Sequence, residues 1–419
     1  MVIVAEKRAR WQAVPALCLA LVMAACTPAR KAPAPAPPPP PAPVVVAPKP
    51  VPLPEAPQNR VALLVPLSGN NAPVGQSIAN AANLALTDVG DKRVNLRVYD
   101  TGPGAGAAAA EAMKDGAGLI LGPLLAADVP AVTAAVGARP VPVISFSNDA
   151  GVAGGNVFVL GFQPGQSIAR TVAYARSRGI DRFAALVPAG TYGERAQAAF
   201  VRAVNDAGGR VTGIATYTRD PARMAAAARK VTNYDARAQG TAKPVLRADG
   251  TVARAAPTAL VPVPFQALLV ADSGSVAAQF APALARFGAA QGQVVLMGTE
   301  IWNTEAGIAR SPALKGAIFS AVPDARFVRM AERYRTRFGG NPSRLASMGY
   351  DAVLLVNALA GRWPLGAPFP RAALSARDGF AGIDGAFRFT PGNVAERALE
   401  VEQVGAGTIA VVSPAPTSF

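Results

Sequence analysis

From residue 60 onward, the hydrophobic positions alternate between short continuous apolar runs and longer segments with helical spacing. The run "RVALLVP" predicts a buried strand, because its central positions are all apolar. The next segment, "VGQSIANAANLALTDV", predicts a helix over 74–89 with Ile78, Ala82 and Leu86 on one face. Strand and helix therefore alternate from the start of this region.

The same unit recurs along most of the chain. Further strands are predicted at 94–100, 118–122, 141–146, 182–188, 210–217, 265–272 and 293–300, with helical segments between most of them. Such alternation is typical of a parallel sheet covered by helices on both faces. Two series of this kind predict an α/β fold with two doubly wound parallel-sheet lobes and a cleft between them.

One segment interrupts the alternation. Residues 233–264 are irregular in pattern and too long for an ordinary connection in a compact domain. We interpret this segment as either a mobile flap or a docking segment.

The first 25 residues have the pattern of a secretory signal peptide. Lys7, Arg8 and Arg10 precede an apolar run of about fifteen residues that ends in small residues. This run is too short for a comfortable membrane span. The residues just before Cys26 resemble a bacterial lipobox, although Met23 stands where leucine is usual.

Cys26 is the predicted lipidation site. The lipobox resemblance implies that its thiol is acylated and that it becomes the first mature residue. The only other cysteine, Cys18, lies in the predicted signal, so Cys26 cannot join a disulfide framework and is better explained as an attachment point. An ordinary signal peptide with a chance cysteine is the alternative. Thr27 follows where an aspartate would favour the inner membrane, which implies the outer membrane of a Gram-negative bacterium.

Residues 26–59 are predicted to form a tether after the lipidated cysteine. They are almost entirely Pro, Ala, Val and Lys, a composition that favours an extended polyproline path and cannot bury a core. At about 3.1 Å per residue, such a tether reaches on the order of 100 Å. The predicted globular part is 60–419.

The charge of the chain is strongly basic. It has 41 Lys and Arg against 26 Asp and Glu, a net charge of +15, which falls to about +13 without the predicted signal. In an exported protein this balance favours anionic surfaces or an acidic partner. Nucleic acid is not predicted as a partner, because the basic residues are scattered and not interleaved with aromatic residues.

The chain contains no histidine. Serine and cysteine triads that need an imidazole are therefore excluded, as are the common zinc sites. The chain also contains no phosphate-binding loop of the GxxxxGK[ST] type and no GxSxG. We therefore predict no enzymatic activity, no cofactor and no metal.

Several polar residues follow predicted strands, where ligands of open sheets bind. These cleft candidates are Ser68, Ser145, Ser147, Asp272 and Glu300. Each also has a purely structural interpretation. The two serines near 146 could cap a turn, and Asp272 with its neighbour could begin a helix.

Five motifs in order carry a family resemblance. "VALLVPLSGNNAPVGQSIANAANLAL", "LILGPLLAADVPAV", "VPVISFSND", "LVPAGTYGERAQAAF" and "ASMGYDAVLLVNAL" resemble type I periplasmic binding proteins of the leucine/isoleucine/valine-binding group. In that family the chain crosses between lobes three times. This implies a first lobe at about 60–163 and 300–363 and a second at about 164–299 and 364–419.

The resemblance also implies roles for single residues. Tyr192 matches an aromatic residue that closes over an amino-acid ligand, Glu300 an acid that meets the ligand ammonium, and Ser147 lies near the loop that receives the ligand carboxylate. Ala126 stands where these binders place a carboxylate-binding serine, which weakens the case for an amino-acid ligand. Tyr192 could also be a packing residue, and we expect Trp302 in the core.

Two functions follow as hypotheses. A lipid anchor, a long proline-rich tether and this fold resemble the outer-membrane lipoproteins that activate penicillin-binding proteins, which implies a periplasmic docking protein whose partner is a peptidoglycan synthase. The alternative is a solute-binding lipoprotein of an ABC-type amino-acid or amide uptake system, with a small amino-acid-like ligand.

Overall fold

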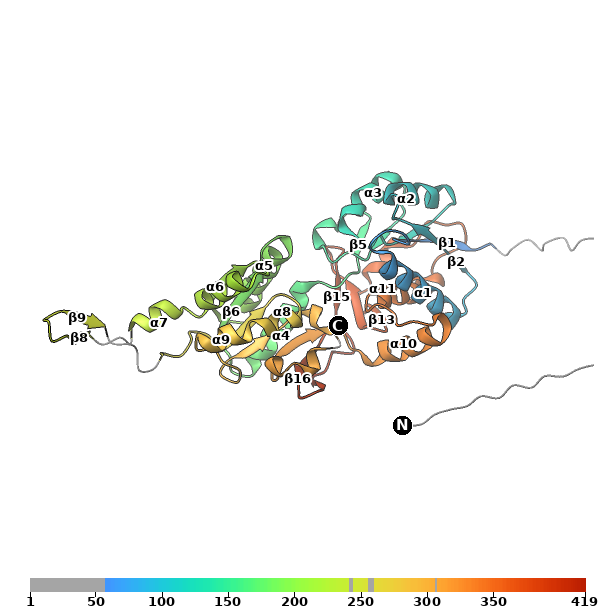
Figure 1. The fold of residues 1–419 in the computed structure, drawn as a ribbon. Helices are drawn as coiled ribbons and strands as arrows, with labels where there is room; N and C mark the ends of the chain where they lie inside the picture. Colours follow the sequence, from blue (N-terminus) through green and yellow to red (C-terminus); the bar gives the residue numbers. More distant parts are fainter. Residues whose placement is uncertain (1–56, 241–243, 255–259, 306) are drawn as a thin grey trace, which may run out of the picture. The chain divides into compact units, whose positions relative to one another are not determined.

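The computed structural model describes residues 57–240, 244–254, 260–305 and 307–419 (Figure 1). The predicted signal, Cys26 and nearly all of the tether lie outside these residues. Residues 56–419 form one compact unit. Two sheets, each with its own hydrophobic core, divide this unit into two lobes.

The first lobe is built on a five-stranded parallel sheet in the order β2-β1-β3-β4-β5. Its strands and the helices between them are β1 (Asn59–Val65), α1 (Ala72–Val89), β2 (Val94–Asp100), α2 (Ala105–Lys114), β3 (Leu119–Leu121), α3 (Val129–Val136), β4 (Val143–Ser145) and β5 (Val157–Val159). The predicted apolar face of α1 is confirmed, since Ile78 and Ala82 are fully buried.

The second lobe is built on a seven-stranded sheet in the order β17-β16-β12-β11-β10-β6-β7. Its elements are α4 (Pro164–Ser177), β6 (Arg182–Pro188), α5 (Thr191–Asp206), β7 (Arg210–Tyr217), α6 (Pro221–Val231), β10 (Ala267–Val270), α8 (Gly274–Gln279), α9 (Ala281–Arg286), β11 (Val295–Met297), β12 (Ile318–Ala321), β16 (Glu400–Val404) and β17 (Ile409–Ser413). The last two strands are antiparallel to their neighbours. The predicted class, two doubly wound parallel-sheet lobes, is confirmed.

The chain returns to the first lobe between the strands β12 and β16. This segment holds α10 (Ala325–Phe338), α11 (Ala346–Ala360), β13 (Phe380–Gly382), β14 (Gly385–Phe389) and β15 (Ala395–Arg397). The last three form a small antiparallel sheet, and Phe387 and Phe389 join the core that α1 and α11 share.

The predicted positions of two lobe crossings are wrong. The crossing placed at about 300 lies near 322, because the buried run Ile318–Ala321 adds a further strand to the second sheet. The crossing placed at about 364 lies near 398, because the aromatic residues of β14 pack on the first lobe. The first crossing lies between Leu160 and α4.

The segment 233–264 is more regular than its sequence pattern suggested. It contains α7 (Tyr234–Gly240) and a hairpin of β8 (Pro244–Leu246) and β9 (Val252–Arg254), which form a sheet of their own.

In each lobe, a glycine near the start of the helix that follows the first strand allows a tight strand–helix turn. A Cβ on Gly75 of α1 would lie 1.8 Å from the Pro66 carbonyl oxygen, and one on Gly193 of α5 would lie 1.7 Å from that of Pro188. Both carbonyls belong to the chain that leaves a central strand. Only glycine allows the helix to approach the strand this closely.

We predict that Gly193→Ala lowers the free energy of unfolding by about 2 kcal/mol or more, because the added methyl group must displace backbone. Gly340→Ala is the matched control, since its Cβ would meet no atom within 4 Å. Thermal melting of both variants checks this. Equal melting temperatures for the two variants would contradict the close approach.

Candidate functional site at the lobe crossings

The serines predicted for the cleft are held by hydrogen bonds within the first lobe. Ser145, which ends β4, donates to the Pro123 carbonyl at 3.1 Å and accepts from the backbone N–H of Ser147 at 3.2 Å. The Ser147 hydroxyl accepts from the backbone N–H of Asp149 at 3.0 Å. Both serines are buried. These bonds agree with the turn-capping interpretation.

Ser68 lies after β1 and is exposed. The nearby Asp100 carboxylate accepts from the backbone N–H groups of Leu67 at 2.7 Å and Gly102 at 2.8 Å. Ser68 thus belongs to a bonded turn that joins the ends of β1 and β2.

Asp272 lies two residues after β10, and its carboxylate oxygens are hydrogen-bonded. Its carboxylate accepts from the Tyr217 hydroxyl at 2.8 Å and from Arg219 at 2.6 and 3.1 Å. Its backbone carbonyl accepts from the indole N–H of Trp302, which is fully buried, so the prediction that this tryptophan lies in the core is confirmed. Asp272 therefore holds neighbouring elements together.

Tyr192 and Glu300 are brought to one place in the second lobe. The Tyr192 hydroxyl lies 3.3 Å from the hydroxyl of Thr299, the residue before Glu300. Burial, together with the Glu300 charge, raises the pKa of Tyr192, which keeps the phenol neutral. Tyr192 and Glu300 therefore lie near each other in the second lobe, and their roles toward a ligand stay a prediction.

Glu300 differs from the other candidates because part of its carboxylate has no partner. Its Oε2 is buried and accepts no hydrogen bond from any described residue. Burial raises the pKa of Glu300 to about 7. Glu300 lines a cavity of about 30 Å³ together with Arg344 and Arg397. This volume suits about two water molecules.

The two arginines beside Glu300 form a buried ionic network that the sequence analysis missed. Arg344 precedes α11 and donates to Asp384 at 2.8 Å and to Asp324 at 3.2 Å. Arg397, only 2% exposed at its side chain, pairs with Asp351 at 3.4 Å. Asp351 was the available signal, because it stands among apolar residues on α11, where a charge needs a partner.

This network joins the three chain segments that cross between the lobes. Phe162 on the first segment lies beneath both guanidinium groups, 5.8 Å from Arg344 and 5.0 Å from Arg397. Asp324 stands on the second segment. Arg397 begins the third and donates to the Leu160 carbonyl on the first at 3.1 Å. The relative placement of the crossings therefore depends on buried charges.

The network leaves some polar atoms unsatisfied. Among the described residues, the buried side-chain atoms without a hydrogen-bond partner are Glu300 Oε2, Arg344 Nη2, Asp384 Oδ2, Arg397 Nε and Glu402 Oε1. All belong to the crossing region or to β16 beside it. Burial and the nearby Asp324 and Glu400 raise the pKa of Glu402 to about 8.

A second contact joins the lobes at the predicted cleft. Arg195 on α5 donates to Asp149 in the loop after β4 at 2.9 Å. Asp149 is the residue whose backbone N–H bonds Ser147. The serine loop therefore presents a carboxylate to the second lobe, where the resemblance implied a ligand.

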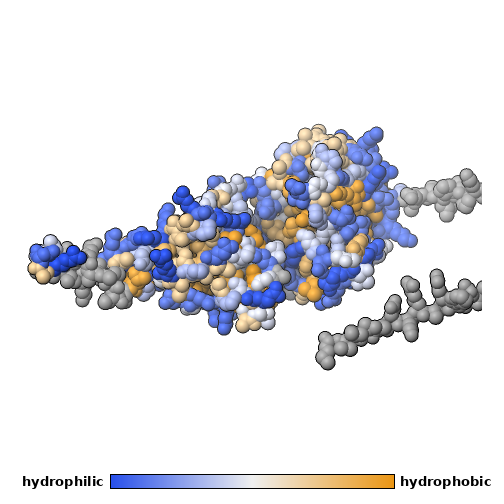
Figure 2. All heavy atoms as spheres, in the orientation of Figure 1, coloured by the Kyte–Doolittle hydropathy of each residue, from blue (hydrophilic) through white to orange (hydrophobic). Residues whose placement is uncertain are grey.

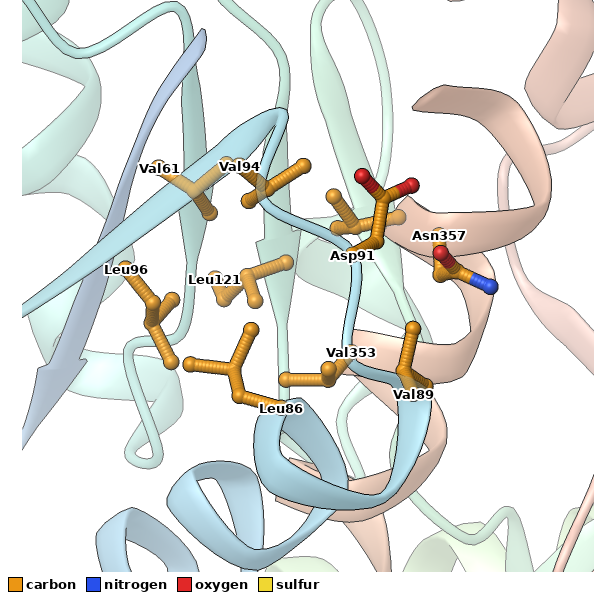
Figure 3. Close-up of a pocket in the computed structure, with 10 residues that line it drawn as sticks. Val61, Leu86, Val89, Asp91, Val94, Leu96, Leu121, Val353 and Asn357 are labelled. Carbon is orange, nitrogen blue, oxygen red and sulfur yellow. The ribbon is translucent and has the colours of Figure 1, made fainter. Parts of the chain in front are cut away.

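Other hollows lie away from these residues. A void of about 10 Å³ lies between β1, β2, α1 and α11. The side chains that line it, mainly valine and leucine, are drawn in Figure 3. It is too small for a ligand. Open hollows of about 440 and 420 Å³ lie beside α9 and beside β2. In the described part of the chain, no group of three or more Asp, Glu, Cys or His side chains could hold a metal ion.

Comparisons with known proteins place this architecture in a family. The sequence model of the periplasmic binding protein family matches residues 58–408. The chain therefore belongs to the periplasmic binding protein family, with the two-lobe architecture of its type I members. A search of curated proteins found no significant match.

Solved structures with the same fold include transporter components and a regulator. A protein described as a branched-chain amino acid ABC transporter from Rhodospirillum rubrum has a TM-score of 0.69 and 22% identity, covering 85% of this chain and 100% of that one. A branched-chain amino acid ABC transporter ligand-binding protein from Burkholderia xenovorans has a TM-score of 0.63 and 18% identity, covering 85% and 95%. The C-domain of LpoA from Haemophilus influenzae, a regulator of PBP1A, has a TM-score of 0.59 and 19% identity, covering 84% and 100%.

We predict that Arg397→Met lowers the free energy of unfolding by about 3–5 kcal/mol, because it leaves the Asp351 carboxylate buried without its ionic partner. Arg329→Met, at an exposed position on α10, is the control. Denaturant melts of both variants measure the difference. A loss below about 1 kcal/mol for Arg397→Met would show that the network does not hold the crossings.

The raised pKa values predict a pH dependence of stability. A carboxyl group whose pKa is raised by folding binds more protons in the folded state, so the free energy of unfolding falls as pH rises from about 4.5 to about 8. Glu402→Gln should flatten this fall, because the amide cannot ionise. Melting temperatures from pH 5 to 8.5 check it, with Glu396→Gln on β15, whose side chain is 40% exposed, as the control. Identical slopes for wild type and Glu402→Gln would refute the assignment.

Proposed function

We propose that this chain is a periplasmic lipoprotein, anchored to the outer membrane through Cys26, that docks on and activates a penicillin-binding protein that synthesises peptidoglycan. Its action is binding and not catalysis. Docking favours the active state of the synthase, and the activation can only be as large as the difference in affinity between the two synthase states.

One observation favours the docking function over the function of a solute receptor. Four of the six predicted cleft residues, Ser145, Ser147, Tyr192 and Asp272, already have side-chain hydrogen bonds within the protein, and Ser68 is exposed. Glu300 faces a cavity of about 30 Å³, while pockets for small molecules usually measure about 300 Å³ or more. The Arg195–Asp149 pair also occupies the serine loop. A polar ligand would have to displace these bonds, and displaced buried groups are costly to leave unpaired.

Other features support the proposal. The LpoA C-domain shares the fold and regulates a penicillin-binding protein, which makes such a partner reasonable for this chain. The predicted tether would carry the domain on the order of 100 Å from its anchor. No helix in the described part of the chain is both long and apolar enough to cross a membrane. Membrane attachment in this proposal therefore rests on Cys26.

A second candidate function is a solute-binding lipoprotein of an amino-acid or amide uptake system. The orphan Glu300 Oε2 favours it, because a ligand ammonium would supply the missing donor. The transporter components among the structures of the same fold point in the same direction. In this function, ligand binding would open the small cavity.

We expect the mature chain to show no shift in melting temperature against a panel of amino acids and small amides. A true ligand at 100 times its Kd would add about 2.7 kcal/mol. We expect the same chain to raise the rate of peptidoglycan synthesis by the bifunctional penicillin-binding protein of the same organism.

Glu300→Gln separates the two functions. It should leave stimulation of the synthase unchanged. A ligand-induced shift that Glu300→Gln abolishes, together with no stimulation by the wild type, would replace the docking proposal with the uptake function.

A further inference from the structure

The edges of the two large sheets differ in the side chains that they expose. An edge strand presents unpaired backbone N–H and C=O groups, and natural proteins protect such edges with charged or polar side chains or with very short strands. The four edge strands here are β2 and β5 in the first lobe and β7 and β17 in the second.

Three of these edges are protected. The exposed residues of β2 are Asn95 and Arg97, and those of β7 are Arg210 and Thr216. The strand β5 has only three residues, all buried, and Val159 at its end bridges to Val394. Each of these edges therefore discourages pairing with another chain.

The strand β17 has no such protection. Its sequence, "IAVVS", contains no charge and no proline, and its exposed residues are Ile409, Ala410 and Val411. Ile409 is 39% exposed and Val411 is 52% exposed. An uncharged, apolar and exposed edge is the kind of edge to which another strand adds.

The strand is nevertheless held firmly in the sheet. Ile409, Ala410 and Val411 pair in regular antiparallel register with Val404, Gln403 and Glu402 of β16.

Anchors at the end of β17 hold it as well. Val412 packs against the core of the second lobe. Beyond a register irregularity near Val412, Arg170 of α4 donates to the Ser413 hydroxyl at 2.6 Å. The apolar side chains are thus exposed on an ordered strand and not on a frayed end.

We propose that β17 is the docking edge, and that an extended apolar segment of an acidic partner adds to it as the next strand of the sheet. Backbone hydrogen bonds would supply affinity, and Ile409 and Val411 would contact alternate side chains of the added strand. This inference rests on the proposed function, in which the partner is the synthase.

The net positive charge of the chain favours an acidic partner over a second copy of the chain as the occupant of β17. Each copy carries the same excess of about +13 without the predicted signal, so two copies repel each other. An acidic partner is attracted by the same excess, and Arg170 places one positive charge at the end of β17. A strand from an acidic protein is therefore the occupant that the charges favour.

The test is Val411→Lys in the full mature chain, because a lysine on an edge strand blocks strand addition. Val328→Lys is the matched control, since Val328 on α10 is also 52% exposed. The probe is the periplasmic part of the bifunctional penicillin-binding protein of the same organism. Affinity is measured by calorimetry, and self-association by light scattering.

We expect Val411→Lys to weaken binding by about tenfold or more. We expect Val328→Lys to bind like the wild type, and both variants to melt within about 1 °C of it. Tight binding by Val411→Lys would overturn the docking edge but leave the proposed function intact.

Two further results would also overturn the inference. Absence of binding by the wild type would remove the proposed function itself. A wild-type dimer that Val411→Lys dissociates would assign the edge to a second copy of the chain.

Discussion

The arrangement of the two lobes depends on two buried guanidinium groups at the point where the chain crosses between them. Arg344 and Arg397 lie over Phe162 and bind carboxylates from the second crossing, from α11 and from the small sheet of the first lobe. Burying these charges is costly unless each finds a partner, so the three crossings have to remain where their partners can be reached. The buried atoms that still lack partners gather in the same region, which makes it the part of the domain where a change in protonation has most effect on stability.

The lobes themselves obey a simpler constraint. In each lobe the first strand ends in a proline whose carbonyl meets a glycine of the following helix, so the turn between them is tight. Residues in and after such turns reach the cleft, which is why polar residues there are natural candidates for ligand binding. In this protein most of them are hydrogen-bonded to other groups of the protein, and Arg195 on the second lobe bonds the serine loop of the first. The fold of a solute receptor is thus present, while its cleft is largely satisfied from within.

Because most polar groups of the cleft are bonded within the protein, the outer surface is the better candidate for binding a partner. Hydrophilic residues cover much of the face drawn in Figure 2, with apolar patches between them. Among the edge strands of the two large sheets, β17 differs because its exposed residues are apolar. The longer edge strands β2 and β7 expose polar and charged side chains. In the proposed docking function an ordered surface matters more than a deep pocket, and β17, anchored by Val412 and Arg170, is an ordered edge. The strong positive charge acts at longer range and favours encounters with acidic partners.

The sequence by itself determined the fold class and most elements up to β11, because apolar runs and helical spacing are local signals that burial enforces. It also brought out Tyr192 and Glu300, which lie near each other in the second lobe. It misplaced two lobe crossings, since which sheet receives the strand Ile318–Ala321 depends on neighbours far along the chain. It missed the buried ionic network of Arg344, Asp351, Asp384 and Arg397. The partners are distant in sequence, and a charged residue is expected at the surface unless its burial is known. Only the tertiary structure decided that the candidate serines and Asp272 bond internally, because a hydroxyl or carboxylate is free for a ligand only when no nearer donor or acceptor reaches it.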